Sequence, residues 1–145
     1  MPERETIEQA REDAREGKSP STQAGEFVRE EMHHVREGKH GARSPQQAIA
    51  IGLSKARRAG VKLQPPKGPA SRRKKAQQDT KAGQKSRRKT SPTRSRAISG
   101  ALKRESKKSA TRGELSRQGK RSAAARDKRA PSAAARQAAP TKKAA

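Results

Sequence analysis

Apolar side chains recur at helical spacing in two segments of this chain, about 20–37 and 45–59. The side that they share in the first segment consists of Ala24, Val28, Met32 and Val35, with Phe27 at its edge. The corresponding side of the second segment consists of Ala48, Ile49, Gly52, Leu53, Ala56 and Ala59. Glu31 interrupts the first of these sides. The pattern predicts two amphipathic helices, each of which buries one face.

A repeated unit marks where these helices begin. The letters REGKSPSTQA occupy 15–24, and REGKHGARSPQQA occupies 36–48 with a three-residue insertion. In both copies a helix is expected to stop at Gly and the next one to start at Ser-Pro, because proline needs no hydrogen-bond acceptor in the first turn. Ser19 and Ser44 are the predicted N-caps, and Gln47 should complete a capping box with Ser44.

The two helices should form an αα-hairpin joined by residues 38–43. Gly60 followed by Val61 predicts a Schellman stop with an apolar contact at the end of the second helix. The apolar side chains are few for the length of chain that must be ordered. We therefore expect this hairpin to be weak as a monomer and more stable as a dimer or on its ligand.

The first 18 residues predict a polar N-terminal helix over 2–16. Pro2 suits the first helical position, and Gly17 suits the stop. Ile7, Ala10 and Ala14 give only a thin apolar stripe, so this helix should be marginal alone.

The remainder of the chain has a different composition. Gln64 to Pro69 should break any helix, and residues 64–145 carry 26 Lys or Arg against four acids. Leu, Ile, Val and Phe number only 12 of 145 residues, as is typical of chains that are largely disordered. The expected fold is small and all-α, with a weak helix at 1–18, a helical hairpin at 19–63 and a mostly disordered tail at 64–145 that forms transient helices.

The charge of this tail indicates a polyanionic partner. Solubility requires a net charge of only about 2 to 8 on a small domain, and the tail far exceeds it. We expect non-enzymatic, largely sequence-independent DNA binding through phosphate neutralisation, with the hairpin used for self-association or partner contact. The predicted contacts are Arg72, Arg73, Lys74, Lys75, Lys85, Arg87, Arg88, Lys89, Arg94, Arg96, Lys103, Arg104, Lys107, Lys108, Lys120 and Arg121.

Two further features bear on nucleic-acid contact. Lys55, Arg57 and Arg58 should point away from the apolar side of their helix and could form a secondary contact, or could simply complement the helix dipole. The letters SPTR at 91–94 resemble the S-P-x-K/R element of histone tails, a turn that places its Arg in a narrow minor groove.

Two other functions are compatible with the sequence. One is RNA or ribosome association, since electrostatic attraction does not distinguish RNA from DNA, although sequence-specific RNA reading uses stacking aromatics and this chain has only Phe27. The other is a protein-interaction module whose tail acts as a polyelectrolyte or as an anchor to a membrane surface.

Catalytic, metal and cofactor sites are not expected. The chain lacks Cys, Tyr, Trp and Asn, and no nucleophile, base and orienting partner can be assembled from it. His33 and His34 point in different directions on one helix, and His40 lies in a glycine-flanked loop. Glu30 and Glu37 lie at an i, i+3 or i, i+4 spacing from these histidines. We nevertheless expect a surface histidine pair without a metal.

The N-terminus is charged from the third residue, so we expect no secretory signal, and no run of residues approaches the length of a membrane span. A soluble intracellular protein is therefore expected.

The stretch REGKHGARSPQQAIAIGLSKARRAG at 36–60 resembles a family of small basic bacterial proteins with a domain of unknown function. In that family a Gly-Lys loop precedes an A-I-A-I-x-L-S-x-A-R-x-A-G helix. The resemblance extends loosely over about 26–68, implies a bacterial, cytoplasmic protein and supplies no catalytic residues. The tail is similar in composition to the Lys/Ala-rich tails of histone H1 and of bacterial histone-like proteins. Together, the two resemblances imply a nucleoid-associated protein, located in the cytoplasm at the nucleoid.

Overall fold

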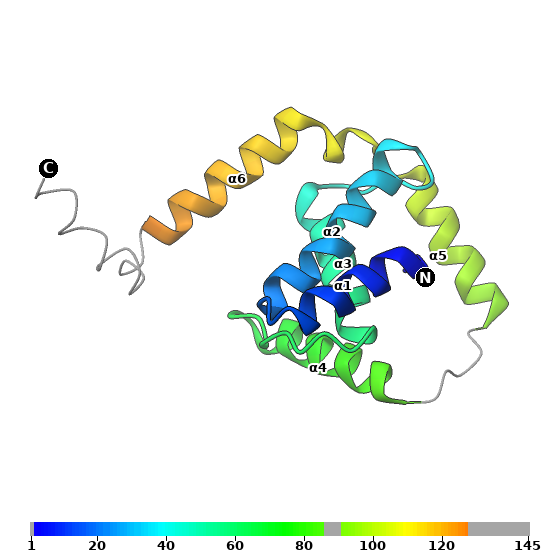
Figure 1. Cartoon of the computed structure of the whole chain (residues 1–145). Helices are drawn as coiled ribbons and strands as arrows, with labels where there is room; N and C mark the ends of the chain where they lie inside the picture. Colours follow the sequence, from blue (N-terminus) through cyan, green and yellow to red (C-terminus); the bar gives the residue numbers. More distant parts are fainter. Residues whose placement is uncertain (1, 86–90, 128–145) are drawn as a thin grey trace, which may run out of the picture. The chain divides into compact units, whose positions relative to one another are not determined.

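The computed structural model describes residues 2–85 and 91–127, and every regular element in these residues is helical (Figure 1). The α-helices are α1 (Arg4–Arg15), α2 (Pro20–Arg36), α3 (Pro45–Arg58), α4 (Ala70–Gln84), α5 (Pro92–Arg104) and α6 (Arg112–Asp127), with a 3₁₀ turn η1 (Lys108–Ala110) between the last two. The predicted all-α class is confirmed for the described residues.

The local signals at the helix ends behave as predicted. Ser19 accepts a hydrogen bond from the N–H of Thr22 at the start of α2, and Ser44 accepts one from Gln47 at the start of α3. The Gln47 side chain differs from a regular capping box, because its Oε1 accepts from the N–H of Arg43 at 2.7 Å and not from Ser44. Both Ser-Pro pairs therefore start helices.

The repeated REGK letters form two similar helix ends. Gly17 and Gly38 have φ angles of 74° and 76°, a conformation that glycine adopts without a steric penalty. At the end of α3, the N–H groups of Gly60 and Val61 donate to the carbonyls of Arg57 and Ala56, each at 3.1 Å. That pair of bonds is the predicted Schellman motif.

Helix α1 begins later than predicted. Glu3 occupies the N-cap and Arg4 is the first helical residue, so Pro2 lies outside the helix. The thin apolar stripe of α1 is nevertheless used, because Ile7 and Ala10 pack in the main hydrophobic core. Packing on α2 supplies the stability that this helix lacks on its own.

The core lies where α1, α2 and α3 meet. Phe27 is completely buried at its centre, although the sequence placed this side chain at the edge of the apolar face. Helices α2 and α3 approach closely at Gly52, where an added Cβ would lie 2.7 Å from Cα of Val28. The core consists of Ala10, Ala24, Phe27, Ala56 and Val61, with Ile7, Leu53 and Leu63 packed against it.

The segment after Leu63 differs from the expected disordered tail. Residues 64–69 are non-helical as predicted, but α4 then packs against α3 and buries Ala76 and Asp79. The turn η1 packs against α2 and α3 as well, and buries Ser109 and Ala110. The physical reason is a set of long-range polar contacts, described below, which composition alone does not show.

The chain therefore divides at a different place from the predicted boundary after residue 63. It forms two compact units, Met1–Thr111 and Arg112–Ala145. Within the second unit, the described residues form α6. The predicted contacts Arg87, Arg88 and Lys89 lie outside the described residues, as does the second SAAAR sequence at 132–136.

Candidate functional site

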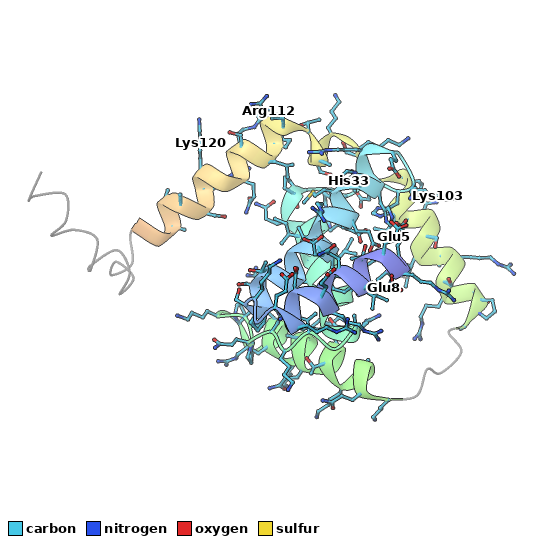
Figure 2. The ribbon with its side chains drawn as sticks, in the orientation of Figure 1. Glu5, Glu8, His33, Lys103, Arg112 and Lys120 are labelled. Atoms are coloured by element: carbon cyan, nitrogen blue, oxygen red, sulfur yellow. The ribbon has the colours of Figure 1, made fainter. Side chains whose placement is uncertain are left out.

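The predicted nucleic-acid contacts that the structure describes are all exposed. Every Lys and Arg side chain described between residues 64 and 125 is accessible to solvent, on α4, α5, η1, α6 and the loops that flank them. Figure 2 shows Lys103 on α5 and Lys120 on α6 as examples. The cationic groups are thus accessible to an external polyanion.

Few acids lie near these cations. Asp79 pairs with Lys75 and Arg58, and Glu114 pairs with Arg117, three residues later on the same helix. Residues 38–78 contain no acid at all, whereas the ten acids of the first 63 residues all lie between Glu3 and Glu37. The positive charge of α4, α5 and α6 is consequently only slightly compensated within their own segments.

Asp79 is the link between α4 and the core. Its side chain is 3% exposed and accepts hydrogen bonds from Ser54 at 2.8 Å and from Lys75 at 3.2 Å, besides those of Arg58. Burial raises the pKa of Asp79, but the bonds from Ser54, Arg58 and Lys75 outweigh it, and the net pKa lies below the ordinary value. The carboxylate therefore stays charged and holds α4 on α3.

The secondary contact predicted on α3 is only partly available. Lys55 does not point away from the buried side, because its side chain is 18% exposed and pairs with Glu30 and Glu31. Arg58 is engaged by Asp79 while its side chain remains 54% exposed. Of the three predicted residues, Lys55 is thus withdrawn from any phosphate contact by its position between two carboxylates.

The SPTR letters begin a helix. Pro92 is the first residue of α5, and Ser91 is its N-cap without a side-chain hydrogen bond. Arg94 and Arg96 lie in the first turns of this helix and are exposed. Their geometry is that of a helical surface and differs from the isolated turn of a histone-tail element.

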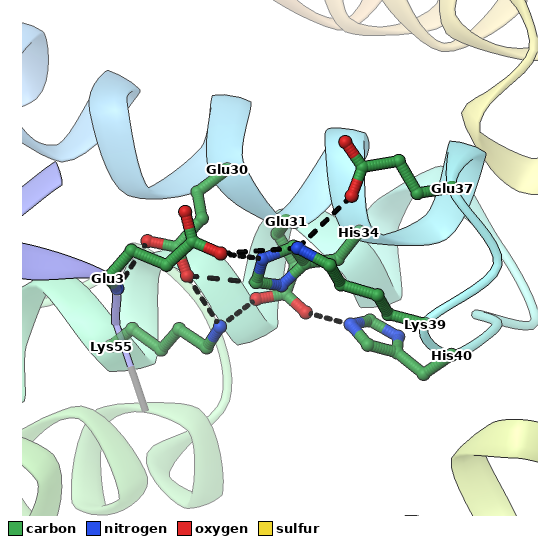
Figure 3. A network of polar contacts seen from close by, with 8 residues as sticks. All are labelled: Glu3, Glu30, Glu31, His34, Glu37, Lys39, His40 and Lys55. Carbon is green, nitrogen blue, oxygen red and sulfur yellow. Dashed lines mark hydrogen bonds and ion pairs between the residues drawn. The ribbon is translucent and has the colours of Figure 1, made fainter. Parts of the chain in front are cut away.

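A network of charged side chains forms where α1, α2, α3 and the loop after α2 meet (Figure 3). It contains four carboxylates, two lysines and two histidines. Its members are Glu3, Glu30, Glu31, His34, Glu37, Lys39, His40 and Lys55. The sequence pattern treated Glu31 as an interruption of an apolar face, and the tertiary structure makes it the centre of a polar cluster.

Glu31 is 1% exposed and is held by two partners. Its Oε1 lies 2.6 Å from Nε2 of His40, and its Oε2 lies 2.7 Å from Nζ of Lys55. A buried carboxylate without such partners would be strongly destabilising, since desolvation of an ion is not otherwise offset. The lysine from α3 and the histidine from the loop therefore offset the cost of burying the carboxylate of Glu31 on α2.

Glu30 connects the network to the start of α1. One of its oxygens lies 3.1 Å from Nζ of Lys55, and the other accepts the backbone N–H of Glu3 at 3.2 Å. Burial raises the pKa of Glu30, but hydrogen bonds from Thr6 and Lys55 lower it by more than burial raises it, so the net pKa is below the ordinary value. Glu30 therefore completes the N-terminus of α1, which has no side-chain cap of its own.

His34 and His40 lie close together, a contact that the sequence pattern did not predict. Their ring centroids are 5.9 Å apart in a T-shaped arrangement, and His34 Nε2 lies 3.0 Å from Oε1 of Glu3. This hydrogen bond, together with Lys39, lowers the pKa of Glu3. His33 is exposed, so the pair that converges is not the pair adjacent in sequence.

The sequence contained one signal for this cluster besides the helical spacing of Glu30 and Glu37 from the histidines. Glu31 stands three residues before His34, a helical spacing that puts both side chains on one face. The position of His40 could not be obtained in that way, because it depends on the path of the loop.

An open hollow of about 350 Å³ lies beside the network, between α1 and α2. Its lining is mainly acidic, with Glu3, Glu5, Glu26, Glu30 and Glu37, and it includes His33 and His34. Figure 2 labels Glu5 and His33 on the two helices. In the first unit the acids thus gather on α1 and α2, away from the exposed cations of α4.

No helix in the described part of the chain has the length and apolarity needed to cross a membrane. No curated protein and no solved structure matches the chain significantly. A family model does match part of it. The matched segment, residues 15–68, runs from the end of α1 through α2 and α3 to the loop before α4. The predicted likeness to a domain of unknown function is confirmed for this segment, which is similar to the Family of unknown function (DUF6496).

Proposed function

We propose that this protein is a non-enzymatic DNA-binding protein of low sequence specificity that acts at the bacterial nucleoid. The observation that supports the proposal best is the exposure of every described Lys and Arg side chain between residues 64 and 125. Such side chains neutralise phosphates and release condensed counterions, which favours binding to any duplex.

The absence of an exposed Phe, Tyr or Trp side chain favours backbone contact over base readout. The one aromatic side chain of the types Phe, Tyr and Trp is Phe27, and it is completely buried in the core. Proteins that read single-stranded bases generally stack them on aromatic rings. Contacts from α4, α5 and α6 to phosphates would be indifferent to base sequence.

The α2–α3 pair, which we interpret as a helical hairpin, would serve self-association or contact with a partner. It carries the segment similar to the family of unknown function, and two of its cations, Lys55 and Arg58, form internal ion pairs. A second copy of the chain bound through this region would join two basic segments and allow two duplexes to be bridged.

The test is the salt dependence of binding to a mixed-sequence duplex. The variant R72Q/R73Q/K74Q removes three exposed cations from α4, and R4Q/R11Q/R15Q removes three exposed cations from α1 as a matched control. Each phosphate contact contributes about −0.9 to the slope of log K against log salt. We expect the α4 variant to flatten the slope by about 2 to 3 and the α1 variant to leave it unchanged. Equal effects of the two variants would contradict the proposed interface.

A competition experiment distinguishes DNA from RNA. Labelled duplex DNA bound to the full chain is displaced with unlabelled duplex DNA or with structured RNA of equal length. The proposal requires that DNA compete at least as well as RNA. Clear preference for RNA would replace it by ribosome or RNA association.

A further inference from the structure

The charged network around Glu31 has the composition of a metal site. Glu31, His34 and His40 each offer one ligand atom, and these three atoms lie within 4.8 Å of one another. The side chains are 1%, 12% and 16% exposed, respectively. Two imidazoles and one carboxylate form a ligand set that zinc commonly uses, with a remaining position open to water or another ligand.

The contacts of His40 direct its ring at Glu31. Nδ1 of His40 lies 3.0 Å from the carbonyl oxygen of Gly41, and Nε2 lies 2.6 Å from Oε1 of Glu31. When Nδ1 donates to this carbonyl, which only accepts, the neutral ring presents the lone pair of Nε2 to the carboxylate. In that orientation the ring nitrogen and the carboxylate oxygen can ligate one metal ion.

The contacts behind the ligands resemble those that orient metal-binding residues. Histidine ligands usually donate their second N–H to a carbonyl or carboxylate, and ligand carboxylates are themselves hydrogen-bonded. His40 has its carbonyl partner in Gly41, and the second oxygen of Glu31 forms an ion pair with Lys55 at 2.7 Å. Glu31 and His40 are thus oriented before any ion binds.

The loop that carries His40 is fixed by a distant part of the chain. The N–H of Gly41 donates to the carbonyl of Leu102 at 2.8 Å, and the N–H of Ala42 donates to Ser106 at 2.9 Å. A Cβ added at Gly41 would lie 2.0 Å from the carbonyl oxygen of Glu105, so the two backbones are in direct contact. Such support keeps a ligand on a loop from moving freely.

The charge of the network also fits a divalent cation. Its four carboxylates face two lysines, and with neutral histidines the sum is −2. Nitrogen and carboxylate donors together favour zinc and neighbouring transition metals over magnesium or calcium, which prefer all-oxygen sites. The acidic hollow, whose lining includes His34, gives an ion a route from solvent.

We propose that Glu31, His34 and His40 bind one Zn²⁺ ion in the first unit. Any proton that Nε2 of His40 or the Glu31 carboxylate carries is released to solvent when the ion binds. Zinc bonds of about 2.0 to 2.1 Å place tetrahedral ligand atoms roughly 3.3 Å apart. The Glu31 and His40 atoms therefore separate slightly on binding, while His34 moves inward. The ion would cross-link α2 to the following loop.

The experiment is a titration of the full chain, freed of metals by a chelator, with ZnCl₂ in an isothermal calorimeter. We expect one equivalent of Zn²⁺ to bind. His34→Asn and His40→Asn should each weaken this binding at least ~10-fold, because even the loss of a residue that only supports a ligand has an effect of about that size. His33→Asn is the matched control, since His33 is adjacent and exposed, and should bind as tightly as the parent. Absence of a stoichiometric event, or unchanged affinity in both variants, overturns the proposal.

A second measurement does not depend on the folding of the variants. Imidazole nitrogen resonances of the parent chain are recorded with and without one equivalent of Zn²⁺. Large shifts confined to His34 and His40 support the site, and a shift of His33 alone, or of none of the three, contradicts it. Neither experiment uses DNA, so its result is independent of the proposed function.

Discussion

Asp79 of α4 accepts two hydrogen bonds from the guanidinium group of Arg58 on α3, at 3.0 Å from Nε and 2.8 Å from Nη2. Arg58 is the last residue of α3, which lies within the segment 15–68 that is similar to the family of unknown function. Asp79 is one of only four acids after residue 63. This contact joins the first helix of the basic region to the core. It also explains why the compact unit extends far beyond the predicted boundary at residue 63.

Replacing Asp79 by Asn should release α4 from α3. The amide cannot attract Arg58 and Lys75 as the carboxylate does, and the buried Ser54 bond would lose its charged acceptor. Hydrogen exchange should therefore accelerate in α4 by ten-fold or more, while amides of α2 change little. Glu8→Gln, at an exposed acid of α1, is the control. Unchanged protection of α4 in the Asp79 variant would show that apolar contacts alone hold it.

Acid should destabilise the first unit through Asp79 and Glu30. The pKa of each is lowered in the folded state, so the unfolded chain binds protons more readily and stability falls as pH decreases. The contribution is present above the unfolded values of about 3.9 and 4.3 and is lost as pH drops through the lower folded values. Urea unfolding between pH 7 and pH 2.5 measures this decline. It should be shallower in D79N/E30Q, and an identical decline would contradict the assignment.

Removing Lys55 should be costly because two buried carboxylates depend on it. Lys55→Met leaves Glu30 and Glu31 without their shared cation, and breaking a buried pair in this way costs about 3 kcal/mol of unfolding free energy. The double variant E31Q/K55M should lose less than the sum of the two single variants. Lys62→Met, at an exposed position, should change stability by less than about 0.5 kcal/mol. Additive losses in chemical denaturation would argue against coupling of Lys55 with Glu31.

Gly52 should tolerate no side chain where α3 crosses α2. A Cβ at Gly52 would lie 2.7 Å from Val28 Cα and 3.0 Å from the Phe27 carbonyl oxygen, so Gly52→Ala should cost about 1 to 3 kcal/mol. Gly25→Ala in α2 meets no atom within 4 Å and should instead stabilise the helix by up to about 1 kcal/mol. Thermal unfolding followed by circular dichroism compares the two. A gain of stability in both variants would mean that the helices can separate at Gly52 without loss.

Much of the fold of residues 15–68, the segment similar to the family of unknown function, could be predicted from local signals. The Ser-Pro pairs at 19–20 and 44–45 start α2 and α3, and glycine ends them, because capping depends on side chains within a few residues. The apolar periodicity identified the buried faces of both helices. It placed Phe27 only at the edge, since position on a helix does not reveal how a neighbouring helix crosses it.

The two polar sites could be predicted far less well. In the sequence Glu31 interrupts an apolar face, and Asp79 is one of four acids among the 26 cations after residue 63. Both become buried anchors only because partners arrive from elsewhere: Lys55 and His40 for Glu31, and Ser54 and Arg58 for Asp79. The composition gives the number of charged residues, but it does not show which of them form pairs.

The amino-acid sequence by itself determined the ends of the first three helices to within a few residues, the all-helical class and the concentration of positive charge after residue 63. These properties depend on neighbouring residues or on composition. Only the tertiary structure decided that α4 and η1 join the core and that His34 and His40 meet beside Glu31. Such contacts join segments distant in sequence, and their stability depends on burial and on charge pairing that exist only when the chain is folded.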